Sequence, residues 1–116
     1  FVIPDFEDVL TNNEARKYDW KLAEFAAFEL DLRLALYENA IDNLCVSNGT
    51  STVAYYSSSP VKMFKILVDG QNSTSEKALL YSAGVAKGTS PSFYKENQKW
   101  IWKDDTFENI MGTLKA

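Results

Sequence analysis

The sequence contains no histidine and only one cysteine, Cys45. Without histidine, the chain lacks the commonest general base at neutral pH and the commonest metal-binding side chain. A single thiol cannot form a disulfide within the chain, so a small disulfide-stapled scaffold is not expected. We therefore predict that the protein is not an enzyme and uses no cofactor, and we assign no catalytic and no metal-binding residue.

Long apolar runs and an excess of basic residues are also missing. No run of about 18 apolar residues occurs, so no membrane-spanning segment is expected. The net charge of −4 argues against nucleic acid as a partner, because phosphate binding needs clustered lysine and arginine. The chain is nevertheless 46% hydrophobic and 14% aromatic, so it can bury a core, and its length fits one small domain, residues 1–116.

The compartment of the protein is not fixed by the sequence. The first residue is Phe1 and not methionine, so we expect that a signal sequence, a pro-segment or the rest of a longer protein preceded it. Two glycosylation sequons, at Asn48 and Asn72, would fit secretion. They are no more frequent than the content of asparagine, serine and threonine gives by chance, so we leave the localisation unassigned.

Residues 28–37, FELDLRLALY, fit two local structures. Their leucines alternate with polar residues as in a strand, but leucine, alanine, glutamate and arginine favour a helix. The surrounding residues favour the helix, because residues 14–44 contain no glycine or proline and residues 13–39 no valine, isoleucine or threonine. We predict one long helix over about 14–44 with two apolar faces, one of which contains Phe25, Phe28, Leu32 and Leu36.

The remaining elements are shorter. Strands are predicted near 50–56, 61–68 and 99–103 from their β-branched and aromatic residues, with a helix opened by Pro60 as the alternative for 61–68. Residues 73–76, Ser-Thr-Ser-Glu, have the capping-box spacing before an apolar run, and Gly84 or Gly88 is expected to end the element, so a helix is predicted over about 75–86. A last helix is predicted over about 105–115. The fold class is α+β, with the long helix packed on the small sheet.

Two patterns resemble catalytic or metal-binding motifs but lack the rest of each motif. Ser59 and Lys62 have the S-x-x-K spacing of serine acyl-transfer enzymes, yet the second and third motifs of those enzymes are absent. Glu24, Asp31 and Glu38 lie seven residues apart, which separates neighbouring carboxylates by about 10.5 Å along a helix. That spacing is too wide for one divalent cation, so we interpret these acidic residues as a solvated edge of the helix.

Residues 99–103, KWIWK, contain the clearest surface candidate. On a strand, Trp100 and Trp102 lie on one face and the lysines on the other. Two neighbouring indoles can cap the core, form part of a protein interface, or stack on a sugar, a base or a proline. The sequence leaves these three interpretations open.

Two hypotheses about function follow from these patterns. A helix of 31 residues is about 46 Å long, whereas a compact domain of this size is ~30–35 Å across, so the helix must kink or project. We expect a non-catalytic interaction or structural assembly subunit, such as a protomer of a virion, an appendage or a multisubunit complex, that contacts another protein or a second copy. The alternative is a small secreted or surface domain that binds a ligand through its tryptophans. The expected interface residues are Phe25, Phe28, Leu32, Leu36, Trp100 and Trp102.

Overall fold

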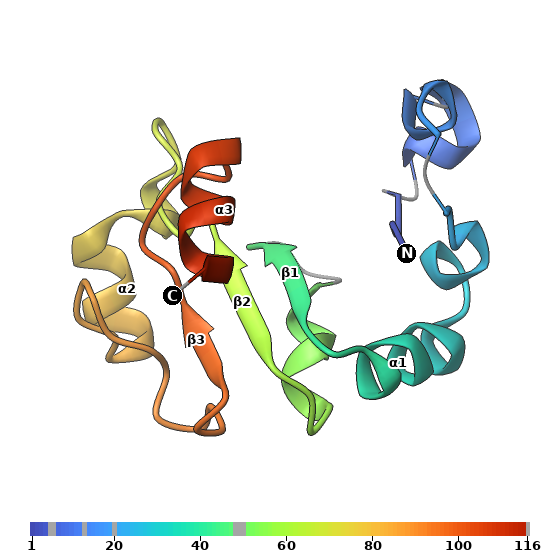
Figure 1. Cartoon of the computed structure of the whole chain (residues 1–116). Coiled ribbons are helices and arrows are strands. Elements are labelled where there is room, and N and C mark those ends of the chain that lie inside the picture. The colour runs from blue at the N-terminus through green and yellow to red at the C-terminus, as the bar shows by residue number, and fades with distance from the viewer. Residues whose placement is uncertain (5–6, 13, 20, 48–50, 116) are drawn as a thin grey trace. The chain divides into compact units, whose positions relative to one another are not determined.

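The computed structural model describes residues 1–4, 7–12, 14–19, 21–47 and 51–115 (Figure 1). The chain divides into two compact units, Phe1–Asn39 and Ala40–Ala116. Its described part contains helices together with a small parallel sheet of three strands, so the predicted mixed, α+β-like class is confirmed. The single-domain organisation predicted for residues 1–116 stays a prediction.

The unit Phe1–Asn39 consists of short helical segments joined by one β-bridge. A π-helical turn, η1 (Asp8–Asn12), precedes two 3-10 helices, η2 (Glu14–Lys17) and η3 (Glu24–Ala27), and the α-helix α1 (Leu30–Asn39). The bridge joins Val2 to Leu22 in parallel. Val2 N donates to Lys21 O at 2.8 Å, and Ala23 N donates to Val2 O at 2.9 Å, so the segment before η3 is extended.

The long helix predicted over 14–44 is not confirmed, because the longest helix in the described residues is α1. Two hydrogen bonds explain its limits. The Ala23 N–H that a continuous helix would use internally is bonded to Val2 instead. At the other end, the side-chain amide of Asn39 donates back to Ala35 O at 2.8 Å, and residues 43–46 leave the helical path to form a strand.

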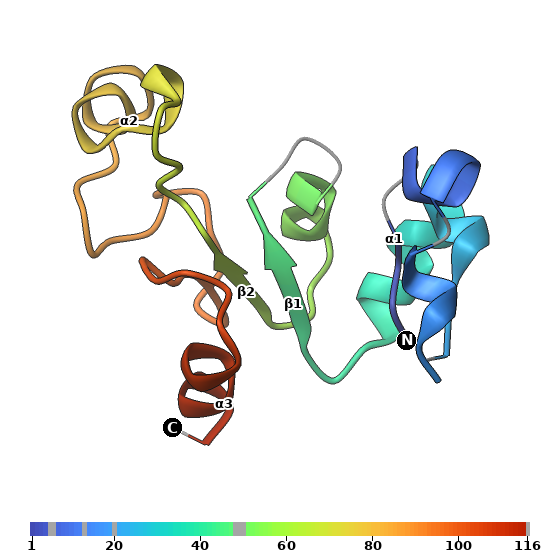
Figure 2. The same cartoon turned by 90° about the horizontal axis from the view of Figure 1, so that it is seen from above.

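The unit Ala40–Ala116 is built on a parallel sheet of three strands (Figure 1). Strands β1 (Asn43–Val46), β2 (Val61–Phe64) and β3 (Gln98–Trp100) lie in the order β1-β2-β3. The 3-10 helices η4 (Ser51–Tyr56) and η5 (Asn72–Thr74) and the helices α2 (Glu76–Ala83) and α3 (Phe107–Lys115) connect or follow them. The two views together place η4 and α3 on opposite faces of the sheet (Figures 1 and 2).

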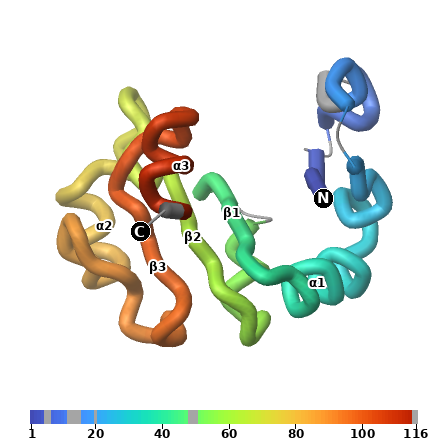
Figure 3. The backbone as a smooth tube through the Cα atoms, viewed as in Figure 1, coloured from blue at the N-terminus to red at the C-terminus, as the bar shows by residue number. Residues whose placement is uncertain are grey.

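The core of this unit is centred on β2. Val61, Met63 and Phe64 in this strand are buried, as are Ile66 after it and Ala54 in η4. A strand with neighbours on both edges and helices on both faces is largely shielded from water, which is why three of the four residues of β2 are apolar and buried. The backbone path in Figure 3 shows β2 between β1 and β3.

The predicted strand at 50–56 is wrong: Ser51–Tyr56 forms the 3-10 helix η4. The physical reason is the direction of the strands. The strands β1 and β2 are parallel, with Asn43 opposite Val61. The chain between them must therefore cross back to the end of the sheet at which β1 begins, and this crossover does not form a strand between β1 and β2. The first two residues of β1, Asn43 and Leu44, lie in the range predicted as the end of the long helix, and pairing with β2 overrides their local preference.

The other predicted elements are present with shorter limits. The strands predicted at 61–68 and 99–103 correspond to β2 and β3, and the helix predicted at 105–115 to α3. The predicted helix is α2, but its cap is Ser75 and not Ser73, where the capping-box spacing begins, and it ends at Gly84, the first of the two glycines expected to end it. The Ser75 hydroxyl accepts a hydrogen bond from Ala78 N at 3.2 Å, and Gly84 is left-handed, with φ of 67°.

Lys65 follows β2 with φ of 55°, a left-handed conformation that is uncommon for residues with a Cβ. The residue turns the chain out of the strand while its N–H donates to Lys103 O at 2.9 Å. Its ammonium lies 3.9 Å from an Asp105 carboxylate oxygen, and both side chains are largely exposed, so this ion pair adds little. The hydrogen bond from Lys65 N to Lys103 O therefore offsets part of the cost of the left-handed backbone conformation at Lys65.

We expect Lys65→Gly to be more stable than Lys65→Ala by about 1 kcal/mol in the free energy of unfolding. Both variants lose the same ion pair, so their difference isolates the cost of a Cβ at positive φ. Chemical denaturation followed by circular dichroism measures it. Equal stabilities would show that residue 65 is not left-handed in solution.

Candidate interaction surfaces

The first candidate surface lies in the unit Phe1–Asn39. We name the residues Phe25, Phe28, Leu32 and Leu36 the apolar surface. Phe25, Phe28 and Leu32 are each 47% exposed, and Leu36 is half-buried. Leu32 and Leu36 lie one turn apart on the same face of α1, whereas Tyr37 on another face is buried. The structure therefore leaves most of this predicted interface accessible to solvent.

An arginine fixes the helices that carry the apolar surface. Arg33 Nε donates to Tyr37 Oη at 2.6 Å, and the guanidinium carbon lies 5.6 Å from the centre of the Tyr37 ring. Arg33 Nη1 also reaches Ala26 O at 3.4 Å, which connects α1 to η3. This arrangement turns the side of α1 that carries Arg33 and Tyr37 toward its own unit and leaves Leu32 exposed.

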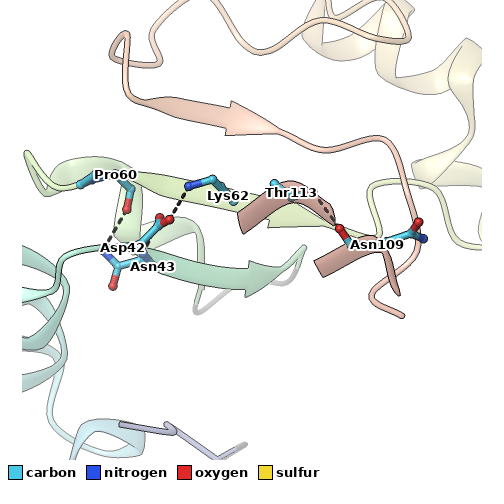
Figure 4. Close-up of polar contacts among 6 residues, drawn as sticks. All are labelled: Asp42, Asn43, Pro60, Lys62, Asn109 and Thr113. Atoms are coloured by element: carbon cyan, nitrogen blue, oxygen red, sulfur yellow. Dashed lines mark hydrogen bonds and ion pairs between the residues drawn. The ribbon is translucent and has the colours of Figure 1, made fainter. Parts of the chain in front are cut away.

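Two acidic residues, Glu24 and Asp42, are each held by a basic partner of their own. Arg16 Nε and Nη2 each donate to a Glu24 carboxylate oxygen at 2.5 Å, and this hydrogen-bonded pairing lowers the pKa of Glu24 below its usual value. Asp42 forms an ion pair with Lys62 and accepts from Asn43 N at 2.9 Å (Figure 4). Across the described residues, no three acidic or cysteine side chains gather where they could hold a metal ion.

The Asp42–Lys62 pair also bears on the S-x-x-K pattern. The Lys62 ammonium that would have to take a proton from Ser59 is engaged by the Asp42 carboxylate. Ser59 itself is buried next to the start of β2. Neither group has the setting that serine acyl-transfer chemistry needs.

The second candidate surface is a run of aromatic side chains in the unit Ala40–Ala116, which we name the aromatic cluster. Trp100 and Trp102, predicted to share a face, lie with ring centres 5.6 Å apart and ring planes at 68°. Tyr94 continues the run at 6.2 Å from Trp100, and Tyr55 lies 4.3 Å from Tyr94. Phe93, 70% exposed, lies 5.3 Å from Tyr94. The rings meet edge to face or tilted, as favourable aromatic pairs do.

Both indole N–H groups of the aromatic cluster are used inside the protein. Trp100 Nε1 donates to Tyr94 Oη at 2.5 Å, and Trp102 Nε1 donates to Thr89 O at 2.7 Å. Burial is the main cause of a raised pKa of the Tyr94 phenol, so the phenol stays protonated at neutral pH. A ligand at this site would meet ring faces and edges but no free indole donor.

Side chains at the start of β3 and just before it donate hydrogen bonds to main-chain carbonyls at the end of η4 and in the loop that follows it. Lys95 Nζ donates to Tyr55 O at 2.9 Å and to Ser57 O at 2.6 Å. Gln98 Nε2 donates to Ser57 O at 3.0 Å, and Asn97 Nδ2 to Ser58 O at 3.0 Å. The loop carbonyls thus find donors within the fold, and Tyr55 is brought against the aromatic cluster.

Sequence reasoning did not identify Phe93, Tyr94, Lys95 or Gln98 as parts of a site. Tyr94 meets Trp100 only because the loop before β3 folds back on the strand. Lys95 and Gln98 have no motif, since their acceptors are main-chain carbonyls about 40 positions earlier in the chain. The closeness of Phe93 and Tyr94 to the tryptophans in sequence was the one available signal.

Comparison with known proteins gives no family for this chain. No family model matches it, and neither the curated proteins nor the solved structures give a match. Among the described residues, no helix has the length and apolar character needed to cross a membrane. A function for the chain must therefore be argued from its own residues.

Gln98, which donates to Ser57 O in the loop after η4, is buried, with 2% of its surface exposed. We expect Gln98→Leu to lower the free energy of unfolding by about 1–3 kcal/mol, because it removes the buried hydrogen bond from Gln98 Nε2 to Ser57 O and leaves Lys95 N without the Gln98 Oε1 acceptor. Asn97→Leu is the matched control, since Asn97 is exposed and water can replace its bond. Urea denaturation monitored by tryptophan fluorescence measures both, and equal losses would contradict the role of Gln98.

The Arg16–Glu24 pair predicts a pH dependence. Because the pKa of Glu24 is lowered in the folded state, the pair stabilises the fold above the ordinary glutamate pKa. That stabilisation is lost as the pH falls through the lowered value. Titration of the Glu24 carboxyl by NMR should show Arg16→Gln raising its pKa, whereas Arg33→Gln should leave it unchanged. The same pKa in Arg16→Gln and the parent protein would show that the pair is absent in solution.

Proposed function

We propose that the protein is a non-catalytic protein–protein interaction or structural assembly subunit. Its partner is another protein or a second copy of the chain, and the apolar surface of the unit Phe1–Asn39 is the contact. The net charge of −4 favours a protein over nucleic acid as this partner. The observation that carries the proposal is the contrast between what this unit buries and what it exposes.

The described hydrophobic side chains that this unit buries are mostly small. Ala23 and Ala26 are fully or almost fully buried, and Tyr37 is the one large side chain among them. Many of its larger apolar side chains are exposed, among them Leu10, Tyr18, Phe25, Phe28, Leu30 and Leu32. A surface with this many exposed large apolar groups on a short segment is typical of a protein contact.

A unit of about 40 residues generally needs a disulfide, a metal or association to be stable. A disulfide within Phe1–Asn39 is excluded, because the one cysteine of the chain is Cys45. The described residues offer no cluster of metal ligands. Association with a further protein surface is one source of such stability, and this supports the proposal.

The ligand-binding alternative at Trp100 and Trp102 has less support. A flat sugar platform uses exposed ring faces and a nearby donor, but these indoles meet at 68° and direct their N–H groups into the protein. Both rings are half-buried by their own loop. The aromatic cluster is therefore better explained as packing that joins η4 to β3.

The proposal predicts that the full chain associates through the apolar surface. We expect sedimentation measurements to give a mass above the 13.1 kDa of the monomer, or a complex with a protein partner in material purified from its natural source. The double variant Phe25→Ser/Leu32→Ser should weaken the association by at least about ten-fold, which is roughly 1.4 kcal/mol.

The matched control is Leu80→Ser/Tyr81→Ser on α2, which removes two exposed apolar side chains from the other unit. It should leave the association unchanged. A compact monomer at every concentration, with no partner in the purified material, would overturn the proposal. Equal weakening by both double variants would show that general stickiness, and not this surface, causes the association.

A further inference from the structure

The two outer edges of the sheet differ in how their backbone groups are satisfied. In a parallel pair, alternate residues direct both N–H and C=O to the same neighbour. Asn43 N donates to Pro60 O at 3.0 Å, so Asn43 and Cys45 face β2. Leu44 and Val46 therefore direct their backbone groups away from the sheet, to the outer edge of β1.

The outer edge of β3 is closed by the protein itself. By the same alternation, Gln98 and Trp100 direct their backbone groups outward. Gln98 N donates to Lys95 O at 2.9 Å, and Trp100 N donates to the Ser90 hydroxyl at 3.0 Å. Both outward donors of this strand are thus occupied, so a further strand cannot use them.

The outer edge of β1 is open by comparison. Val46 O accepts from the Ser51 hydroxyl at 2.5 Å. Within the part of the chain that the structure describes, Leu44 N–H, Leu44 C=O and Val46 N–H have no hydrogen-bond partner. The strand Asn43–Val46 also has none of the charged or proline residues that usually guard a free edge, and Leu44 and Val46 are exposed.

We propose that the outer edge of β1 pairs antiparallel with β1 of a second copy, around a two-fold axis at Leu44. In this register, Leu44 of each copy donates to and accepts from Leu44 of the other. Val46 N of each copy then donates to Asp42 O of the other. These bonds use the open groups of the edge and leave Val46 O with Ser51. The register centred on Cys45 is less suitable, because it requires Val46 O as the central acceptor.

Self-pairing fits this edge because its groups are complementary to themselves. A two-fold axis brings identical residues together, so a charged edge would repel its copy. Here Leu44 meets Leu44, and the nearest carboxylate, Asp42, is neutralised by Lys62 in its own copy (Figure 4). The strand has four residues, so the contact is weak and depends on concentration.

This contact adds a second copy as partner to the proposed assembly function. It lies on the unit Ala40–Ala116 and involves no residue of the apolar surface. The two proposals can therefore fail separately.

Cysteine cross-linking tests the register. In a Cys45→Ser background, Leu44→Cys places two thiols opposite each other with Cα atoms about 5.5 Å apart, within disulfide range. Val46→Cys is the matched control, because it is exposed on the same strand but lies about 13 Å from its counterpart in this register. We expect the Leu44→Cys dimer to form at least about ten-fold faster under mild oxidation. Equal rates would overturn the register.

The mass in solution tests the pairing itself. Leu44→Pro removes an outward N–H that forms no bond within the sheet, so the fold should persist while self-association falls by at least about ten-fold. Leu44→Val keeps the N–H and should still associate. If Leu44→Pro fails to fold, the cross-linking comparison decides. Association that persists in folded Leu44→Pro but is lost in Phe25→Ser/Leu32→Ser would overturn the edge pairing and support the proposed function alone.

Discussion

The parallel pairing of β2 with a strand on each side is the constraint on which the unit Ala40–Ala116 depends. Two parallel neighbours force two crossovers, and each crossover must carry the chain back along the sheet before the next strand begins. The segment 51–56 therefore becomes a 3-10 helix, and α2 lies in the second crossover. The same pairing buries Val61, Met63 and Phe64 and leaves β1 and β3 as edges.

The two edge strands differ in how their outward backbone groups are hydrogen-bonded, and this difference links the fold to the proposed contact at β1. The loop before β3 folds back over its strand, so Ser90 and Lys95 close one edge while Tyr94 packs on Trp100. The same loop therefore closes the outer edge of β3 and forms part of the aromatic cluster. Among the described residues, the Ser51 hydroxyl occupies one carbonyl of the β1 edge, that of Val46. The proposed self-pairing of β1 is based on this difference between the two edges.

The unit Phe1–Asn39 has the opposite character, with much exposed apolar surface and few buried large side chains. Its internal order comes from polar contacts, chiefly Arg16 with Glu24 and Arg33 with Tyr37. Exposed ion pairs contribute little to stability compared with a packed core. A unit held in this way is suited to gaining its hydrophobic cover from another protein surface.

The sequence by itself determined the elements whose signals are local. The polar residues 73–76 and the glycines Gly84 and Gly88 predicted α2 to within a few residues, the β-branched residues predicted β2, and the spacing of the tryptophans predicted that Trp100 and Trp102 lie together. Only the tertiary structure decided that residues 43–46 form a strand and that 51–56 do not. Residues 43–46 form a strand because they pair with β2, and residues 51–56 lie in the connection between these two parallel strands. No local sequence pattern indicates that pairing. A single helix over 14–44 was excluded in the same way, because the backbone of Val2 takes the Ala23 N–H that such a helix would use internally.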